Sequence, residues 1–160
     1  MEKQMKRTLT TLLLILSLAA QAETGRIYIT LTAAVKLQET KPISFGSLIT
    51  TGEATVTIIP TGDRTVTGEV TVPDNIYSEG GFGVTGAPNS AFVVTFGDGS
   101  ATNGKGTITV DNFKTSLSGN VGTTDANGKA VFYIGGTAHI GLTNNSGAYV
   151  GNYTVTAAYQ

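Results

Sequence analysis

The chain has 160 residues, a net charge of −1 at pH 7, one His, no Cys and no Trp. Only 13% of its residues are charged, against about 25% in an average soluble domain. No cluster of basic residues follows Arg7. The sequence therefore lacks the positive patch typical of proteins that bind nucleic acids or anionic membrane surfaces. The absence of Cys excludes disulfides, thiol catalysis and Cys-ligated zinc, while 21 Gly and 27 Thr favour turns and strands.

The first 22 residues are typical of a secretory signal peptide. Lys3, Lys6 and Arg7 precede an apolar run over residues 9–20, and Ala20-Gln21-Ala22 has the small-x-small pattern of a cleavage site. The run is shorter than the about 20 apolar residues that a membrane-spanning helix needs. We therefore predict export with cleavage after Ala22, which removes three cations and one anion and changes the net charge from −1 to −3.

The rest of the chain predicts an all-β domain, because apolar and polar residues alternate with period 2 between clusters of Gly, Asn and Asp. The predicted strands span residues 26–37, 43–49, 54–60, 64–72, 91–96, 106–113, 129–140 and 149–159. The predicted turns are Thr61-Gly62-Asp63, Gly97-Asp98-Gly99 and Asp125-Ala126-Asn127-Gly128. Short strands in this number fit a β-sandwich with one core, and the Gly-rich residues 74–89 are predicted to form a surface loop.

Motifs of catalytic and ligand-binding proteins are incomplete in this chain. Residues 81–86 match G-x-G-x-x-G but precede a predicted strand rather than a helix, and a phosphate loop over residues 99–105 has Gly106 where Ser or Thr is required. The turn that begins at Asp125 lacks the distal Glu of a calcium loop. Alternation places His139 on the solvent face of its strand, and no G-x-S-x-G occurs. We expect no catalytic residue, metal or cofactor, although a glycosidase-like carboxylate pair stays open as an alternative.

Two alternating apolar stretches stand out, one at each end of the exported chain. The N-terminal stretch has apolar residues on one face at Ile27, Ile29, Leu31, Ala33 and Val35. The C-terminal stretch has one face made of Gly147, Tyr149, Gly151, Tyr153, Val155, Ala157 and Tyr159. Because the last strand ends next to the C-terminus, we expect its outer edge to be unpaired, whereas soluble proteins usually cover or charge such an edge. That both stretches are ordinary strands of a closed sandwich is the alternative.

The C-terminal residues resemble the end of chaperone–usher pilus subunits, where a Gly fourteen positions from the end opens an alternating strand and the penultimate residue is Tyr. Here these residues are Gly147 and Tyr159. At the other end, residues 24–31 followed by Ile43-Ser44-Phe45-Gly46-Ser47-Leu48 resemble archaic-type pilins and the spore coat protein U-like group, with related secreted domains of unknown function. The absence of Cys departs from the many pilins that carry a disulfide.

The resemblance implies an immunoglobulin-like β-sandwich that lacks its last strand and is completed by a donated strand. It divides the chain into a signal peptide (1–22), an N-terminal donor strand (23–37) and a pilin-like domain (38–160). A periplasmic chaperone would fill the groove first, and after passage through an outer-membrane usher the donor strand of the next subunit would replace it. The implied partners are thus neighbouring subunits, chaperone and usher, with no nucleic acid and no stable membrane insertion.

Two functions from different classes follow from these features. The first is a structural subunit of a bacterial surface fibre, exported through the periplasm, assembled by donor-strand exchange and without catalytic activity. The alternative is a monomeric secreted β-sandwich that binds a glycan or matrix partner through Tyr77 and Phe82 of the Gly-rich segment. An enzyme is the third and most distant hypothesis.

Overall fold

The computed structural model describes Arg26, Tyr28, Ile29, Leu31 and residues 34–160. The chain divides into two units, residues 1–31 and residues 32–160. In the first unit the four described residues are exposed and belong to no strand, and the predicted signal peptide lies outside the described residues. Within the described part of the chain, no helix has the length and apolar character needed to cross a membrane.

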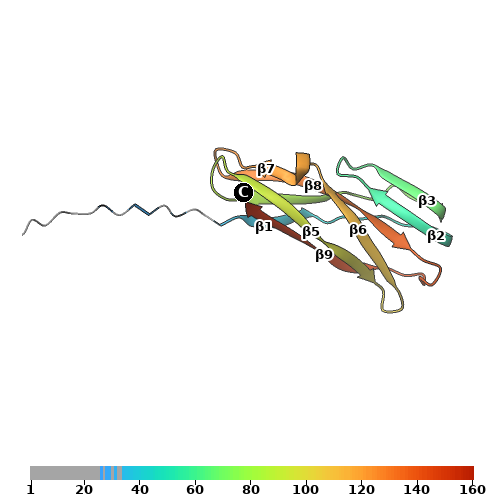
Figure 1. Ribbon diagram of the computed structural model, residues 1–160. Helices are drawn as coiled ribbons and strands as arrows, with labels where there is room; N and C mark the ends of the chain where they lie inside the picture. The colour runs from blue at the N-terminus through green and yellow to red at the C-terminus, as the bar shows by residue number, and fades with distance from the viewer. Residues whose placement is uncertain (1–25, 27, 30, 32–33) are drawn as a thin grey trace, which may run out of the picture. The chain divides into compact units, whose positions relative to one another are not determined.

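The second unit consists almost entirely of strands, which confirms the all-β prediction (Figure 1). A single turn of 3-10 helix, η1 (Ser118–Asn120), interrupts them. The strands are β1 (Lys36–Lys41), β2 (Ile49–Ile58), β3 (Arg64–Thr71), β4 (Gly80–Thr85), β5 (Ala91–Thr102), β6 (Thr107–Thr115), β7 (Val121–Thr123), β8 (Lys129–Ile140) and β9 (Val150–Tyr159).

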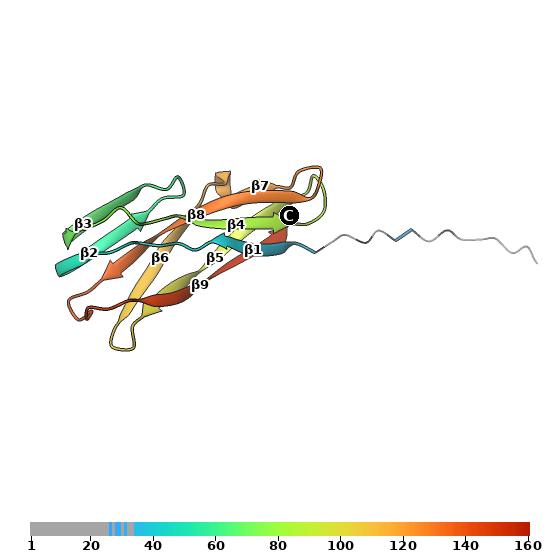
Figure 2. The ribbon, with the colours of Figure 1, turned by 180° about the vertical axis from the view of Figure 1, so that it is seen from behind.

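The strands form one antiparallel sheet that folds over itself, with a seam between two of its edge strands. The hydrogen-bonded order is β1-β4-β8-β6-β5-β7, with β9 on β5, β2 on β8 and β3 on β2. β1 pairs with β4 along one edge and β9 pairs with β5 along one edge, and no described strand pairs with the other edge of either. These two edges lie next to each other in the views from both sides (Figures 1 and 2). We call the space between β1 and β9 the seam.

Period-2 alternation builds the core, as predicted. In β2 the side chains of Ala54, Val56 and Ile58 are buried, whereas Thr55 and Thr57 face outward and bond to threonines of β3 and β8. Phe82, Phe92 and Phe132 form the centre of one cluster between β4, β5 and β8. A second cluster contains Ala54, Val56 and Ile140, with Phe45 and Leu48 packed against it.

The prediction that residues 74–89 form a surface loop is wrong for their second half, which forms strand β4. Phe82 and Val84 are buried in the core, while the residues that alternate with them on the other face are Gly81 and Gly83. Glycine has no side chain to pack and weakens the strand pattern. The alternation was therefore present in the sequence but was concealed by the glycines.

Three other predicted elements also differ from the structure. Residues 43–48 form no strand but one isolated bridge between Ser44 and Ser78, and the described residues between 26 and 35 form no strand. Gly97, Asp98 and Gly99 lie inside β5 rather than in a turn, at a register shift against β9. A bulge of this kind accommodates turn-forming residues within a strand. The predicted turns at Thr61–Asp63 and Asp125–Gly128 are confirmed.

Candidate functional site

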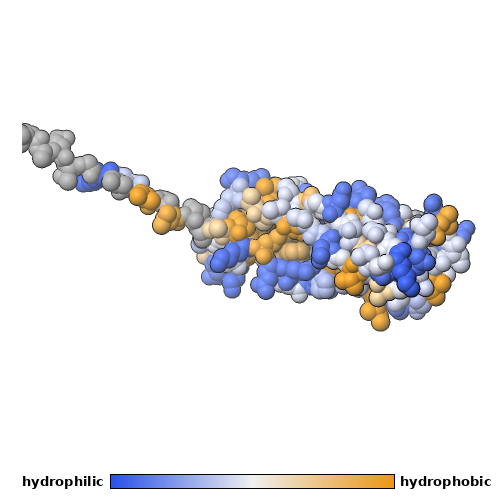
Figure 3. Space-filling model, turned by 90° about the horizontal axis from the view of Figure 1, so that it is seen from below, coloured by the Kyte–Doolittle hydropathy of each residue, from blue (hydrophilic) through white to orange (hydrophobic). Residues whose placement is uncertain are grey.

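A groove of about 1160 Å³ lies along the seam, open to solvent and floored by the hydrophobic core. One wall is β1 together with the irregular residues 42–48 and the first two residues of β2, and the other is residues 144–149 together with β9. Figure 3, which views the molecule from below, shows apolar residues gathered on an otherwise mostly polar face. The apolar residues of the floor are Phe82, Ile108, Val110, Ala138 and Ile140.

The irregular part of this wall is held in place by Arg64 of β3 and by the loop that contains Asp74. Arg64 donates hydrogen bonds to the carbonyl oxygens of Phe45 (3.0 Å) and Asp74 (2.8 Å), and its guanidinium lies 4.1 Å from the centre of the Tyr77 ring. Hydrogen bonds from Ser47 and from the Ile76 N–H hold the pKa of Asp74 below its ordinary value. Arg64 and residues 74–77 therefore fix this part of the wall, although it is not a regular strand.

The opposite wall, residues 144–149, is tied to strand β6 and to the β5–β6 hairpin. Asn144 accepts from the Gly141 N–H (2.7 Å) and donates to the Thr107 carbonyl (2.8 Å). Tyr149 donates its hydroxyl proton to the Asn145 carbonyl at 2.8 Å. Because side chains hold this loop in an open shape, the groove is an organised feature of the fold and not a gap between poorly packed strands.

The two walls meet at one point, where a side chain of β9 reaches β1. The Tyr153 hydroxyl donates to Oε1 of Glu39 at 3.1 Å. Burial raises the pKa of Tyr153 well above its ordinary value, and the negative charge of Glu39 raises it further. The phenol therefore keeps its proton and acts as the donor. Glu39 is the one charged residue among the described residues that line the groove.

The edges that face the groove have main-chain groups that are available for pairing. β9 bonds to β5 on its other side, and within residues 42–48 the backbone–backbone hydrogen bonds among described residues are those of Ser44 with Ser78. An apolar floor between two such edges has the chemistry that accepts an extended peptide, since main-chain pairing provides affinity and alternate side chains fill pockets.

The C-terminal residues singled out in the sequence lie along this site. Gly147, Tyr149, Gly151, Tyr153 and Val155 all line the groove. Ala157 packs against the core cluster of Phe82, Phe92 and Phe132, and the Tyr159 hydroxyl bonds to the backbone N–H of Ala87. The expectation that the outer edge of the last strand is unpaired is confirmed with respect to the described strands.

The N-terminal residues predicted to form a donor strand are only partly described. Ile27 and Ala33 lie outside the described residues, while Ile29 is 77% and Leu31 is 91% exposed. Val35 packs against the core of its own domain, so it would have to leave that contact to serve another copy. The boundary predicted between residues 37 and 38 lies inside β1, which begins at Lys36.

The aromatic pair proposed to bind a glycan does not form a surface platform. Phe82 is 6% exposed and stacks on Phe132 with ring centroids 5.5 Å apart, and the Tyr77 ring is covered by Arg64. The physical reason is the strand β4, which turns Phe82 into the core. The glycan-binding alternative therefore loses the residues on which it was based.

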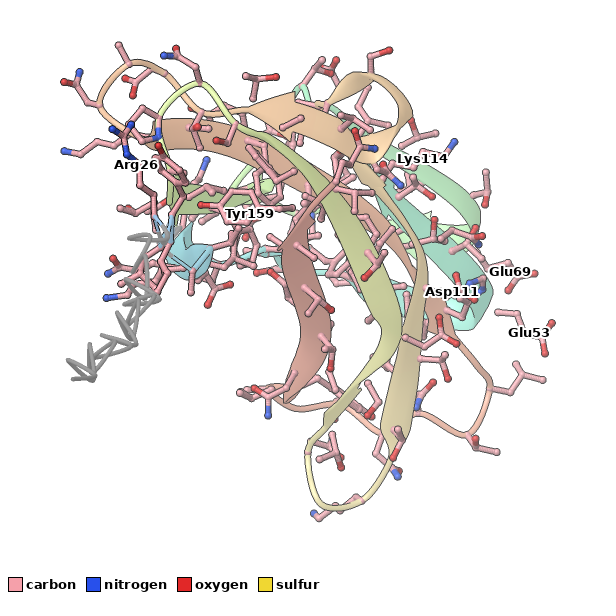
Figure 4. All side chains as sticks on the ribbon, turned by 60° about the vertical axis from the view of Figure 1, so that its left-hand side comes forward. Arg26, Glu53, Glu69, Asp111, Lys114 and Tyr159 are labelled. Atoms are coloured by element: carbon pink, nitrogen blue, oxygen red, sulfur yellow. The ribbon has the colours of Figure 1, made fainter. Side chains whose placement is uncertain are left out.

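Outside the groove, His139 and Asp111 contact each other. His139 faces solvent, as predicted, with Nε2 2.8 Å from Oδ1 of Asp111. Glu53 and Glu69 lie on the same side of the molecule as Asp111 (Figure 4). Among the residues that the structure describes, no three His, Cys, Asp or Glu side chains are placed to hold a metal ion.

Comparison with protein families identifies the domain. A family described as "Domain of unknown function (DUF4402)" matches residues 35–159. The chain belongs to the DUF4402 family. The match covers β1 to β9 and both walls of the groove, so the groove is formed entirely by the DUF4402 domain, whereas residues 27, 29, 31 and 33 precede the match. Neither the curated proteins nor the solved structures include a match to the chain.

Sequence reasoning identified the C-terminal wall but missed the opposite one. Glu39 and Arg64 have no recognisable signal in the sequence, and residues 43–48, which carry part of the resemblance to archaic-type pilins, are predicted to be a strand and not a wall of a groove. Glu39 and Tyr153 are 114 positions apart, and only the closure of the sheet brings them together.

Proposed function

We propose that this DUF4402 protein is a structural subunit of a bacterial surface fibre, in which the N-terminal segment of one copy fills the groove of the next. The observation that carries the proposal is the open groove between the two unpaired edges, β1 and β9, over an apolar floor. An extended apolar segment could pair with these two edges and cover the apolar floor, and the exported chain has such a segment at residues 27–33.

The energetics support strand donation between copies. Ile27, Ile29 and Leu31 would each contribute about 1.5–3 kcal/mol if fully buried, which sums to roughly 5–9 kcal/mol. This is comparable to the total stability of a small domain, so completion of the sheet would be coupled to folding. Since the donor and the groove are different surfaces, the contact is head-to-tail and generates a fibre instead of a closed dimer.

The resemblance to chaperone–usher pilus subunits and to the spore coat protein U-like group supports the same assignment and adds the assembly route. In this proposal a periplasmic chaperone occupies the groove until an outer-membrane usher brings the next subunit, and the fibre is displayed on the cell surface. No catalytic step, metal or cofactor is part of the proposed function.

A deletion of residues 23–31 tests the proposal. The shortened chain keeps the groove but lacks the donor, so it is expected to accept a strand and give none. Exported alone it should form no filaments by electron microscopy, and added to the intact chain it should shorten filaments in proportion to its concentration. Filaments of normal length from the deletion variant, or an intact chain that elutes as a stable monomer at all concentrations, would contradict the proposal and favour a monomeric binding module.

A further inference from the structure

β1 and β9 are joined across the groove by a contact that a donated strand has to remove. β1 and β9 approach each other with Cα atoms within 8 Å. A strand that pairs with both needs them about 9.5 Å apart, twice the usual spacing between neighbouring strands. The two edges therefore have to separate before a donor can pair along the whole length of β9.

The side chain that spans the seam at this point is Tyr153. Its hydroxyl reaches Glu39 on β1, and its ring stacks on Phe113 with centroids 5.0 Å apart and meets Phe82 edge-on at 6.3 Å. The Tyr153 ring thus covers part of the aromatic floor, while its hydroxyl bonds to Glu39 on the opposite strand, β1.

The backbone around this ring is shaped to receive it. A Cβ atom on Gly99 would lie 2.8 Å from Cβ of Tyr153, while one on Gly80 would lie 2.8 Å from Cγ1 of Ile134 and 3.2 Å from the Tyr153 hydroxyl oxygen. The absence of a side chain at Gly99 therefore leaves room for β9 at Tyr153, and its absence at Gly80 leaves room for Ile134 and for the Tyr153 hydroxyl that contacts Glu39.

We propose that the Tyr153–Glu39 contact is a latch. It holds β1 and β9 together in the unfilled domain and sets the rate at which a donated strand inserts between them. The proposal rests on the function proposed above, since it concerns the same groove and takes residues 23–34 of a second copy as the incoming strand. The latch acts on the rate because the contact must break before the strand can pair with both edges.

The experiment uses the full chain with Leu31→Asp as the acceptor, so that it cannot donate, and a fluorescent peptide of residues 23–34 as the donor. Tyr153→Phe keeps the ring and removes the hydroxyl, and Glu39→Ala removes the acceptor of the hydrogen bond. Tyr149→Phe is the matched control, because its hydroxyl bonds within its own wall at Asn145 and does not cross the seam.

Loss of a hydrogen bond to a charged group is expected to raise the insertion rate constant roughly tenfold in Tyr153→Phe and in Glu39→Ala. The double variant should be no faster than either single variant, since both remove one contact, and Tyr149→Phe should match the parent. In the absence of peptide, amide hydrogen exchange in β1 should accelerate in the same two variants, which reports opening of the seam independently.

Unchanged insertion rates in the two latch variants, or equal acceleration in Tyr149→Phe, would overturn the latch and leave strand donation intact if the peptide still binds. Absence of peptide binding to the parent and to every variant would overturn both proposals. The rates and the binding are measured in one titration, so the two failures are distinguishable.

Discussion

A chain that carries Leu31→Asp is expected to form no filaments, whereas Thr30→Asp is expected to form them normally. The alternation of the N-terminal segment assigns residue 31 to the apolar face and residue 30 to the opposite face. In a filled groove, Leu31→Asp would bury a carboxylate without a partner, which costs several kcal/mol or forces its protonation. A charge on the solvent face changes stability by no more than about 0.5 kcal/mol. Filament yield by sedimentation and electron microscopy measures the difference.

The same pair of variants separates a donor from a core residue. Leu31 is 91% exposed in its own chain, so Leu31→Asp should leave the melting temperature of the isolated protein unchanged and its groove able to bind a peptide of residues 23–34. A large fall in melting temperature, with loss of peptide binding, would mean that Leu31 belongs to the core of its own domain.

The second large effect is a loss of folding stability, which we expect for Phe132→Ala at the centre of the core. Phe132 is fully buried and its ring centroid lies 5.5 Å from that of Phe82 and 6.5 Å from that of Phe92. Truncation should cost about 3–5 kcal/mol, a large part of the about 5–15 kcal/mol of a typical domain. Val131→Ala is the neighbouring control, since Val131 is 62% exposed on the outer face.

If strand donation occurs, binding of the donor segment should restore part of the folding stability that Phe132→Ala removes. In the Leu31→Asp background, peptide 23–34 at 100 times its dissociation constant should stabilise the Phe132→Ala domain by about 2.7 kcal/mol. Chemical unfolding with and without peptide measures the gain. A peptide in which residues 29 and 31 are both Asp should give none, and a gain from that peptide as well would show that the effect is not specific to the groove.

The local parts of the fold could be predicted because their signals are local. The turn at Thr61–Asp63 and the strand Lys129–Ile140 were predicted with the observed bounds, since turn residues and uninterrupted alternation act over a few positions. Strand β4 could not be found in this way, because the glycines that flank Phe82 remove the pattern. Its place in the sheet is decided by pairing with β1 and β8.

The candidate site was predictable only along its C-terminal edge. The alternation from Tyr149 to Tyr159 indicated a last strand with an unpaired edge, and β9 has one among the described strands. Much of the other wall lies in residues 42–48, which are held by Arg64 and Asp74 and not by a strand ladder. Contacts of this kind join segments distant in sequence and have no periodic pattern.

Cysteine pairs provide the most direct test of head-to-tail strand donation, because the chain has no Cys of its own. Leu31→Cys is combined in turn with Ser44→Cys, Ala101→Cys or Ala148→Cys, which sample both walls and the β5 side of the groove. A disulfide forms only where the two Cα atoms come within about 4.4–6.8 Å. For at least one pair we expect a ladder of dimers, trimers and longer species on a non-reducing gel, which reduction converts to one monomer band and which Thr30→Cys does not produce. Monomer bands alone from every pair, whether cross-linked within one chain or not at all, would contradict strand donation between copies.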